Sequence, residues 1–133
     1  MSKAERQVGP EPEAAMARIL CHTDALTAAA SGDGAVLWKL AESGRQLDAN
    51  LVRLSPGRHI APHAEPDLDV LVFVVAGNGV LGAGPGGGPQ SLTSGTLFWL
   101  PHGSTRSITA GDDGLAYLTV HRRRSGLQIG QAP

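Results

Sequence analysis

The chain has 133 residues, which is long enough for one hydrophobic core but too short for two domains of ordinary size. Hydrophobic residues make up 41% and charged residues 17%, and this composition excludes a disordered, highly charged chain. The formal net charge of -1 does not favour the electrostatic capture of a polyanion. We therefore expect neither nucleic acid nor a membrane as a partner.

Turn-forming residues and the single cysteine indicate the secondary structure and the location to expect. Eighteen glycines and nine prolines indicate many tight turns, which favours short strands over long helices. Cys21 cannot form an internal disulfide, and the first residues lack the apolar run of a secretory signal. We therefore expect a cytoplasmic protein.

The ends of the chain differ in composition from its middle. Residues 1–13 are polar and contain two prolines, so they are predicted to form a flexible tail, as are residues 126–133. The single domain is then expected over residues 14–125. Residues 14–30 have a helical composition, but they fit a first strand followed by a loop equally well. We expect this segment to add an edge strand or to cross to a neighbouring subunit.

From Ser31 onward, short segments rich in Val, Leu and aromatic residues alternate with turn residues, a spacing typical of a β-sandwich or barrel. Both alternating faces of residues 70–75 are apolar, so this central strand is predicted to be covered on both sides. Residues 82–89 are glycine-rich and are predicted to form a hairpin loop. The predicted strands are 35–41, 46–54, 58–65, 69–76, 79–83, 90–92, 96–100, 105–109 and 115–122.

Two segments carry the functional argument: residues 57–65, GRHIAPHAE, and residues 95–106, GTLFWLPHGSTR. Together with Gly77 they resemble the two halves of the cupin signature, in which glycines and a Pro-x-Gly turn frame metal-binding histidines. The resemblance covers about Leu47 to His121. It implies an all-β, cupin-type β-barrel, also described as a double-stranded β-helix or jelly roll, in a single domain.

The resemblance assigns a ligand position to each of three residues. His63 takes the place of the first metal-ligating histidine, Glu65 takes the place of the second, and Arg106 takes the place of the last. Either Asp69 or Val70 matches the motif's glutamate, and only Val70 keeps the family spacing to Gly77. Two of the three imidazoles are therefore replaced.

An arginine at a ligand position suggests a site that needs no metal. A guanidinium has five donors and no acceptor, so it cannot ligate a cation. Residues two apart on a strand share a face, so His63 and Glu65 are expected to project together. We predict that Arg106 points inward and pairs with Glu65, with Asp69 as a second partner.

Two other hypotheses remain open at this stage. In the first, a divalent transition metal (Zn, Fe, Ni or Mn) binds to His63 and Glu65 with His59 or Asp69, all at odd-numbered positions of an unbroken strand. In the second, His63 and Glu65 are partly exposed residues at a barrel mouth and hold no ligand. His102, in a predicted turn, is expected to be solvent-exposed.

We predict a small-molecule binding module with a metal-poor or metal-free pocket. Its polar groups are His63, Glu65 and Arg106, and its apolar walls come from Leu71, Phe73, Leu97 or Trp99. A metal-dependent cupin enzyme of the oxygenase, isomerase or decarboxylase type is the alternative. If catalysis occurs without a metal, His63 is the candidate base. Because cupins are commonly dimers and exposed sheet edges need cover, a homodimer is expected.

Overall fold

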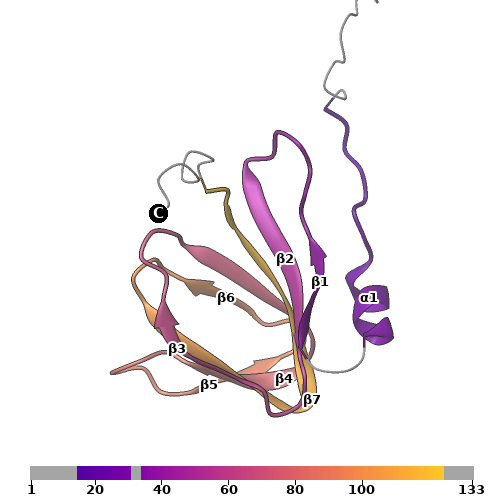
Figure 1. Cartoon of the computed structure of the whole chain (residues 1–133). Helices are drawn as coiled ribbons and strands as arrows, with labels where there is room; N and C mark the ends of the chain where they lie inside the picture. Colours follow the sequence, from indigo (N-terminus) through magenta and orange to yellow (C-terminus); the bar gives the residue numbers. More distant parts are fainter. Residues whose placement is uncertain (1–14, 31–33, 125–133) are drawn as a thin grey trace, which may run out of the picture.

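The computed structural model describes residues 15–30 and 34–124, so the predicted tails at 1–13 and 126–133 lie outside the described residues. Within these ranges, no helix is long and apolar enough to cross a membrane. Figure 1 shows one helix lying outside a folded β-sheet. The elements are α1 (Thr23–Ala29), β1 (Ala35–Lys39), β2 (Leu47–Leu54), β3 (His59–Ala64), β4 (Val70–Gly82), β5 (Gln90–Thr93), β6 (Leu97–Leu100) and β7 (Thr105–Arg122).

The segment before the sheet forms a helix, so the prediction of an edge strand is wrong for the described residues 15–30. Four of the residues from Ala25 to Ala30 are alanines, the best helix former, and Asp24 lies in the first turn, where it faces the positive end of the helix dipole. Residues 15–22 have no regular secondary structure and lead into α1.

Strands β4 and β7 are longer than predicted. The expected strands 69–76 and 79–83 are one strand, β4, and the expected strands 105–109 and 115–122 are likewise one strand, β7. The two pair antiparallel from Leu71 opposite Val120 to Gly82 opposite Ser107. The register shifts between residues 74 and 79, where the pair bends instead of ending.

A pair of glycines allows the two long strands to bend past each other. Gly77 has a φ of 83° and Gly114 a φ of 76°, a region that L side chains rarely adopt. A Cβ on Gly77 would lie 2.1 Å from the backbone oxygen of Gly114. This contact explains why the motif requires glycine at position 77.

The bend divides the sheet into two halves. The first part of β4 and the last part of β7 pair with β6 and β2, and β1 adds to β2 at the edge. The other parts of β4 and β7 pair with β5 and β3. The hydrophobic core draws on residues from both halves: Leu54, Leu68, Val70, Val72, Val74, Leu81, Leu92, Leu100, Ile108, Ala110, Leu115 and Tyr117.

The two faces of β4 differ in their cover. Val70, Val72 and Val74 face the core and are buried, whereas Leu71 and Phe73 on the opposite face are 45% and 40% exposed. The prediction that this strand is covered on both sides is therefore wrong for the single chain. The described residues leave this outer face of β4 only partly covered.

Candidate ligand cavity

A cavity of about 200 Å³ lies on the inner side of the sheet, and both halves contribute to it. Most of its wall is aliphatic or aromatic, and its polar groups come from four residues, one on β3 and three on β7. The lining residues are Ile60, His63, Val70, Val72, Leu100, Arg106, Ile108, Tyr117 and Thr119. The structure thus brings His63 and Arg106 together in one pocket.

A bulge in β3 determines which of its residues face the cavity. Ile60 lies opposite Ile108, and His63 lies opposite Arg106. Between these two pairs β3 therefore has one residue more than β7, which is a β-bulge. Residues opposite each other share a face, so both Ile60 and His63 point inward. His59, opposite Thr109, takes the other face, where its Nδ1 lies 2.8 Å from Thr109 Oγ1. The expected common face for odd-numbered residues therefore fails.

Arg106 points inward, but it is not paired as predicted. Its side chain is only 6% exposed, and Nη1 donates a hydrogen bond of 3.3 Å to the backbone oxygen of Ser104. Within residues 15–30 and 34–124, no carboxylate forms an ion pair with it. The predicted Arg106–Glu65 ion pair is therefore wrong.

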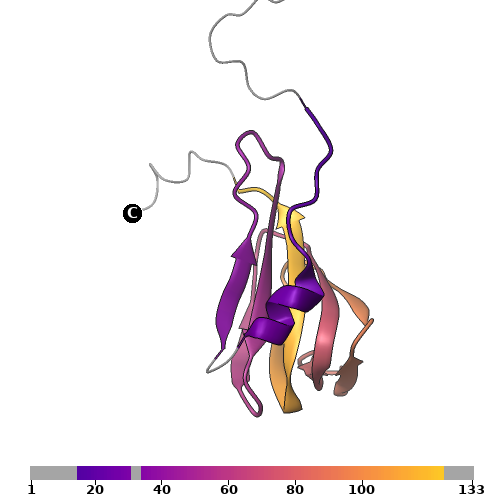
Figure 2. The ribbon, with the colours of Figure 1, turned by 90° about the vertical axis from the view of Figure 1, so that its right-hand side faces the viewer.

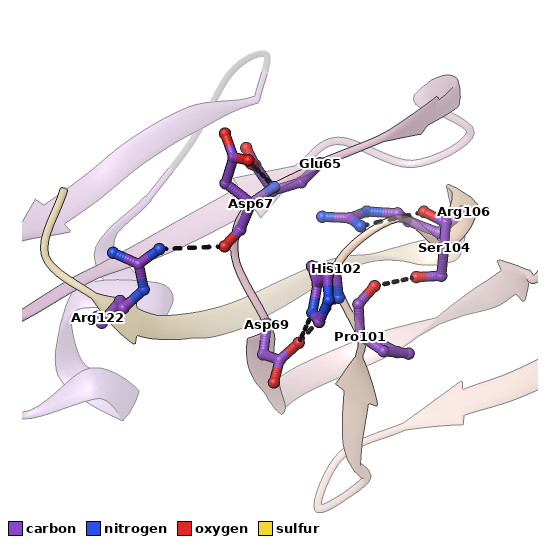
Figure 3. Close-up of polar contacts among 8 residues, drawn as sticks. All are labelled: Glu65, Asp67, Asp69, Pro101, His102, Ser104, Arg106 and Arg122. Atoms are coloured by element: carbon purple, nitrogen blue, oxygen red, sulfur yellow. Dashed lines mark hydrogen bonds and ion pairs between the residues drawn. The ribbon is translucent and has the colours of Figure 1, made fainter. Parts of the chain in front are cut away.

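Glu65 is held at the rim of the barrel instead. Its carboxylate accepts a hydrogen bond of 2.9 Å from the backbone N–H of Asp67 and forms an ion pair with Arg124. Figure 3 shows the Glu65 carboxylate turned toward Asp67, with the Arg106 guanidinium lying apart from it. The Asp67 N–H, and secondarily Arg124, lower the pKa of Glu65. The strand ends at Ala64, so the face-sharing rule no longer places Glu65 beside His63.

A second rim contact involves residues that sequence reasoning did not connect. Asp69 Oδ1 accepts a hydrogen bond from the backbone N–H of His102 at 2.9 Å and lies 2.7 Å from its ring Nδ1 (Figure 3). These two contacts, the backbone one first, lower the pKa of Asp69. Val70 pairs with Leu100, so Asp69 lies close to the turn that holds His102. This register is known from the structure and was not part of the sequence prediction.

Three other polar side chains line the cavity. The Thr119 hydroxyl donates to Asn50 Oδ1 at 2.6 Å, and His63 Nδ1 lies 3.1 Å from the Ala61 carbonyl. A carbonyl only accepts, so Nδ1 of His63 is the donor in this contact, and Nε2 is an acceptor when the ring is neutral. The hydroxyl of Tyr117 has no hydrogen-bond partner among the described residues, and burial raises its pKa, so it stays a donor.

The predicted apolar walls lie elsewhere. Leu71 and Phe73 point away from the cavity, and so do their cross-strand partners Trp99 and Leu97. Trp99 borders a neighbouring depression that Arg106 also lines. The cavity wall is built instead from the alternate residues of the same strands, which include Val70, Val72 and Leu100.

Comparison with known proteins places this geometry in a fold. No family model and no curated protein matches the sequence. A cupin-2 domain protein from Shewanella frigidimarina superposes with a TM-score of 0.61 at 15% identity, covering 78% of this chain and 95% of that one. The chain has the cupin fold. A Klebsiella pneumoniae protein with a double-stranded β-helix domain matches with a TM-score of 0.61 at 18% identity, over 80% of this chain and 90% of its own.

An enzyme with metal centres is also similar in structure. Oxalate decarboxylase of Bacillus subtilis, which has Mn(II) centres, matches with a TM-score of 0.56 at 22% identity, over 62% of this chain and 22% of its own. Identities this low establish the fold of this chain and do not transfer an activity to it.

The four predicted ligand residues, His59, His63, Glu65 and Asp69, do not form a metal site. In the part of the chain that the structure describes, no three His, Cys, Asp or Glu side chains gather as a metal ion would need. The four predicted ligands each have another neighbour: Thr109 for His59, the Ala61 carbonyl for His63, Arg124 for Glu65 and His102 for Asp69. Opposite His63 lies Arg106, whose guanidinium cannot donate an electron pair to a metal.

Proposed function

We propose that this chain is a small-molecule binding module whose cavity binds a carboxylate through Arg106. One observation carries the proposal. Two residues that are each only 6% exposed, Arg106 and Tyr117, line the same cavity. Arg106 donates one hydrogen bond, to the Ser104 carbonyl, and among the described residues no side chain or backbone group accepts from its other N–H groups or from the Tyr117 hydroxyl. These donors are open to the cavity, so they can donate to an acceptor from outside the chain.

The chemistry of these donors specifies the ligand class. A guanidinium is a permanent cation whose planar fork matches the two oxygens of a carboxylate. The Tyr117 hydroxyl can donate to the same group, and His63 Nε2 can accept from a hydroxyl elsewhere on the ligand. The aliphatic wall from Ile60, Val70 and Val72 favours a short apolar body. At about 200 Å³, the cavity is suited to a compact acid rather than a drug-sized molecule.

The test compares acids with neutral molecules of the same shape. Thermal unfolding of the full chain is followed with acetate, butyrate, hexanoate and benzoate, and with the corresponding amides. We expect at least one acid to raise the melting temperature and to bind at least tenfold more tightly than its amide, since the ion-paired hydrogen bonds are lost in the amide. A charged ligand that binds only the folded state must stabilise it.

Two variants separate the roles of the two donors. Arg106→Met keeps a side chain of similar length and should abolish the preference for the acid. Tyr117→Phe removes only the hydroxyl and should weaken the acid by about tenfold, the cost of one hydrogen bond to a charged group. No binding by any acid, or equal binding of acid and amide to the unaltered chain, would overturn the proposal.

A metal-dependent enzyme is distinguished by elemental analysis. The full chain, purified without an affinity tag or chelating resin, is analysed for zinc, iron, nickel and manganese after incubation with each ion. The carboxylate proposal expects no stoichiometric metal, because the guanidinium of Arg106 already places a positive charge opposite His63. One tightly bound ion per chain would contradict it.

A further inference from the structure

A second pocket, of about 280 Å³, adjoins the cavity that Arg106 lines. It lies toward the barrel rim, because Arg124, which pairs with Glu65 at the rim, is part of its wall. Thr119 lines both spaces, so the two pockets meet at this residue. We call the second one the mouth pocket. Its lining residues, most of them polar, are Lys39, Leu40, Arg45, Asp48, Ala49, Asn50, Thr119, His121 and Arg124.

The pairing of β2 with β7 explains why the mouth pocket continues the cavity. Alternate residues of paired strands share a face, so three rows follow one another on the inner face of the sheet. The rows are Val52 opposite Tyr117, Asn50 opposite Thr119, and Asp48 opposite His121. Both β1 and β7 are antiparallel to β2, so they end where β2 begins (Figure 2). The inner face therefore changes from largely apolar in the first row to charged in the last.

The mouth pocket favours negative charge. Three cationic side chains and a single carboxylate, that of Asp48, line it. Burial pushes the pKa of Asp48 up, but the hydrogen bond and charge of Arg45, with the charges of His121 and Arg123, lower it below its ordinary value. A carboxylate at this end of the barrel is thus held in its ionised form, and a carboxylate of a ligand would meet the same cations.

Two donors of the mouth pocket are left without an acceptor. Its two arginines are engaged by Asp48 and Glu65. In the part of the chain that the structure describes, the Lys39 ammonium forms no ion pair or hydrogen bond. Asn50 Oδ1 accepts from the Thr119 hydroxyl at 2.6 Å, and no described group accepts from the amide N–H groups of Asn50. Lys39 lies opposite Asn50, so both donors belong to one row.

We propose that the ligand of this chain is a dicarboxylic acid, with one carboxylate on Arg106 and Tyr117 in the cavity and the other on Lys39 and Asn50 in the mouth pocket. This inference rests on the proposed function of the cavity. Tyr117 and Asn50 are two residues and one strand apart in the register, which is about 8 Å. An extended chain advances about 1.2 Å per bond, so adipate and suberate match this spacing and succinate is too short.

Isothermal titration calorimetry of the full chain compares each diacid with its monoamide, which keeps the length and one carboxylate. Two equivalent ends alone give a diacid about a twofold statistical advantage. We expect adipate or suberate to bind at least tenfold more tightly than its monoamide, since charge-assisted hydrogen bonds to the second carboxylate are lost in the amide. Succinate should show only the statistical advantage over its monoamide.

Two variants locate the second carboxylate. Lys39→Met should remove the preference for adipate over its monoamide and leave the preference for hexanoate over hexanamide intact, because Lys39 lies outside the cavity of Arg106. The matched control is Arg58→Met, which removes an exposed cation from the turn between β2 and β3, at the opposite end of β2. It should leave both preferences unchanged. Circular dichroism checks that both variants are folded.

The outcomes separate this inference from the proposed function. If hexanoate is preferred over its amide through Arg106, but no diacid exceeds the statistical advantage over its monoamide, the second carboxylate site is overturned and the cavity proposal stands. A tenfold preference for adipate that persists in Lys39→Met also overturns the second site, because that carboxylate would then bind elsewhere. Acids that do not bind, or that bind equally well to Arg106→Met, overturn both.

Discussion

The charged residues of the cavity and of the barrel rim differ in burial and in pairing. Arg106 in the cavity is 6% exposed and donates to a single carbonyl oxygen, with no carboxylate partner among residues 15–30 and 34–124. At the rim, Glu65 and Asp69 each have a charged or ionisable partner, Arg124 and His102, and these side chains are 18–64% exposed. The carboxylates that sequence reasoning assigned to the buried cation are thus used at the surface.

Because of this difference, the two kinds of charge affect folding and ligand binding differently. A surface ion pair contributes little to folding because water already solvates both partners. A buried cation without a carboxylate costs folding energy, but it strengthens the attraction for an anion that enters its low-dielectric surroundings. Arg106 in the cavity is therefore expected to lower the stability of the fold and to raise the affinity for an anion. The rim ion pairs are expected to have little effect on either.

The largest expected effect comes from removing the buried charge. Arg106→Met keeps the aliphatic packing and abolishes the desolvated cation, so the free energy of unfolding of the ligand-free chain should rise by about 1–4 kcal/mol. Urea unfolding measures this change. Arg124→Met, which removes an exposed charge, should change it by no more than about 1 kcal/mol. A loss of stability of about 3–5 kcal/mol in Arg106→Met would instead indicate a buried carboxylate partner.

A smaller effect on the free energy of unfolding is expected from combining a substitution in the cavity with one at the rim. Glu65 forms no ion pair with Arg106, whose charge is the smallest of the causes that lower the pKa of Glu65. The effects of Glu65→Gln and Arg106→Met on the free energy of unfolding should therefore add to within about 0.5 kcal/mol. The pair Glu65→Gln and Arg124→Met should deviate from additivity, since these residues form an ion pair. A double-mutant cycle by urea unfolding gives both values. Strong coupling between Glu65 and Arg106 would contradict the structure.

The smallest effect is a dependence on acid. The pKa values of Glu65 and Asp69 are lowered in the folded chain, so both favour folding above their unfolded pKa values and lose this contribution as the pH falls below about 4.5. Glu65→Gln should therefore flatten the loss of stability between about pH 5 and pH 3. Melting temperatures across this range check it. An unchanged acid profile in both Glu65→Gln and Asp69→Asn would contradict the rim contacts.

Much of the barrel could be predicted from local patterns. Alternation and turn residues located the strands to within two residues at most of their ends, and the motif glycine at position 77 lies at the bend that only glycine allows. Arg106 was placed inward because the resemblance gives it the position of the motif's last ligating histidine, and the structure has it only 6% exposed. The continuity of β4 and β7 was missed, because a bulge and a turn give the same glycine signal.

The contacts of the site residues were harder to predict from the sequence. A bulge in β3 is not encoded in residue parity, and it moved His59 to the opposite face from His63. The partner of Glu65, Arg124, is 59 residues away in the sequence and follows the end of β7. Apolar residues alternate on both faces of β4, and from this we predicted that both faces are buried. Hydrophobicity alone does not say whether the rest of the same chain covers such a face.

The central claim is that the buried guanidinium binds an anion. The most direct measurement is the Nε–Hε resonance of Arg106 in an NMR spectrum, identified by its absence in Arg106→Met, during titration with the tightest-binding acid from the panel. The account predicts that this resonance shifts in step with binding while the corresponding signal of Arg124 stays in place. A stationary Arg106 signal, with Arg124 shifting as the acid binds, would contradict it.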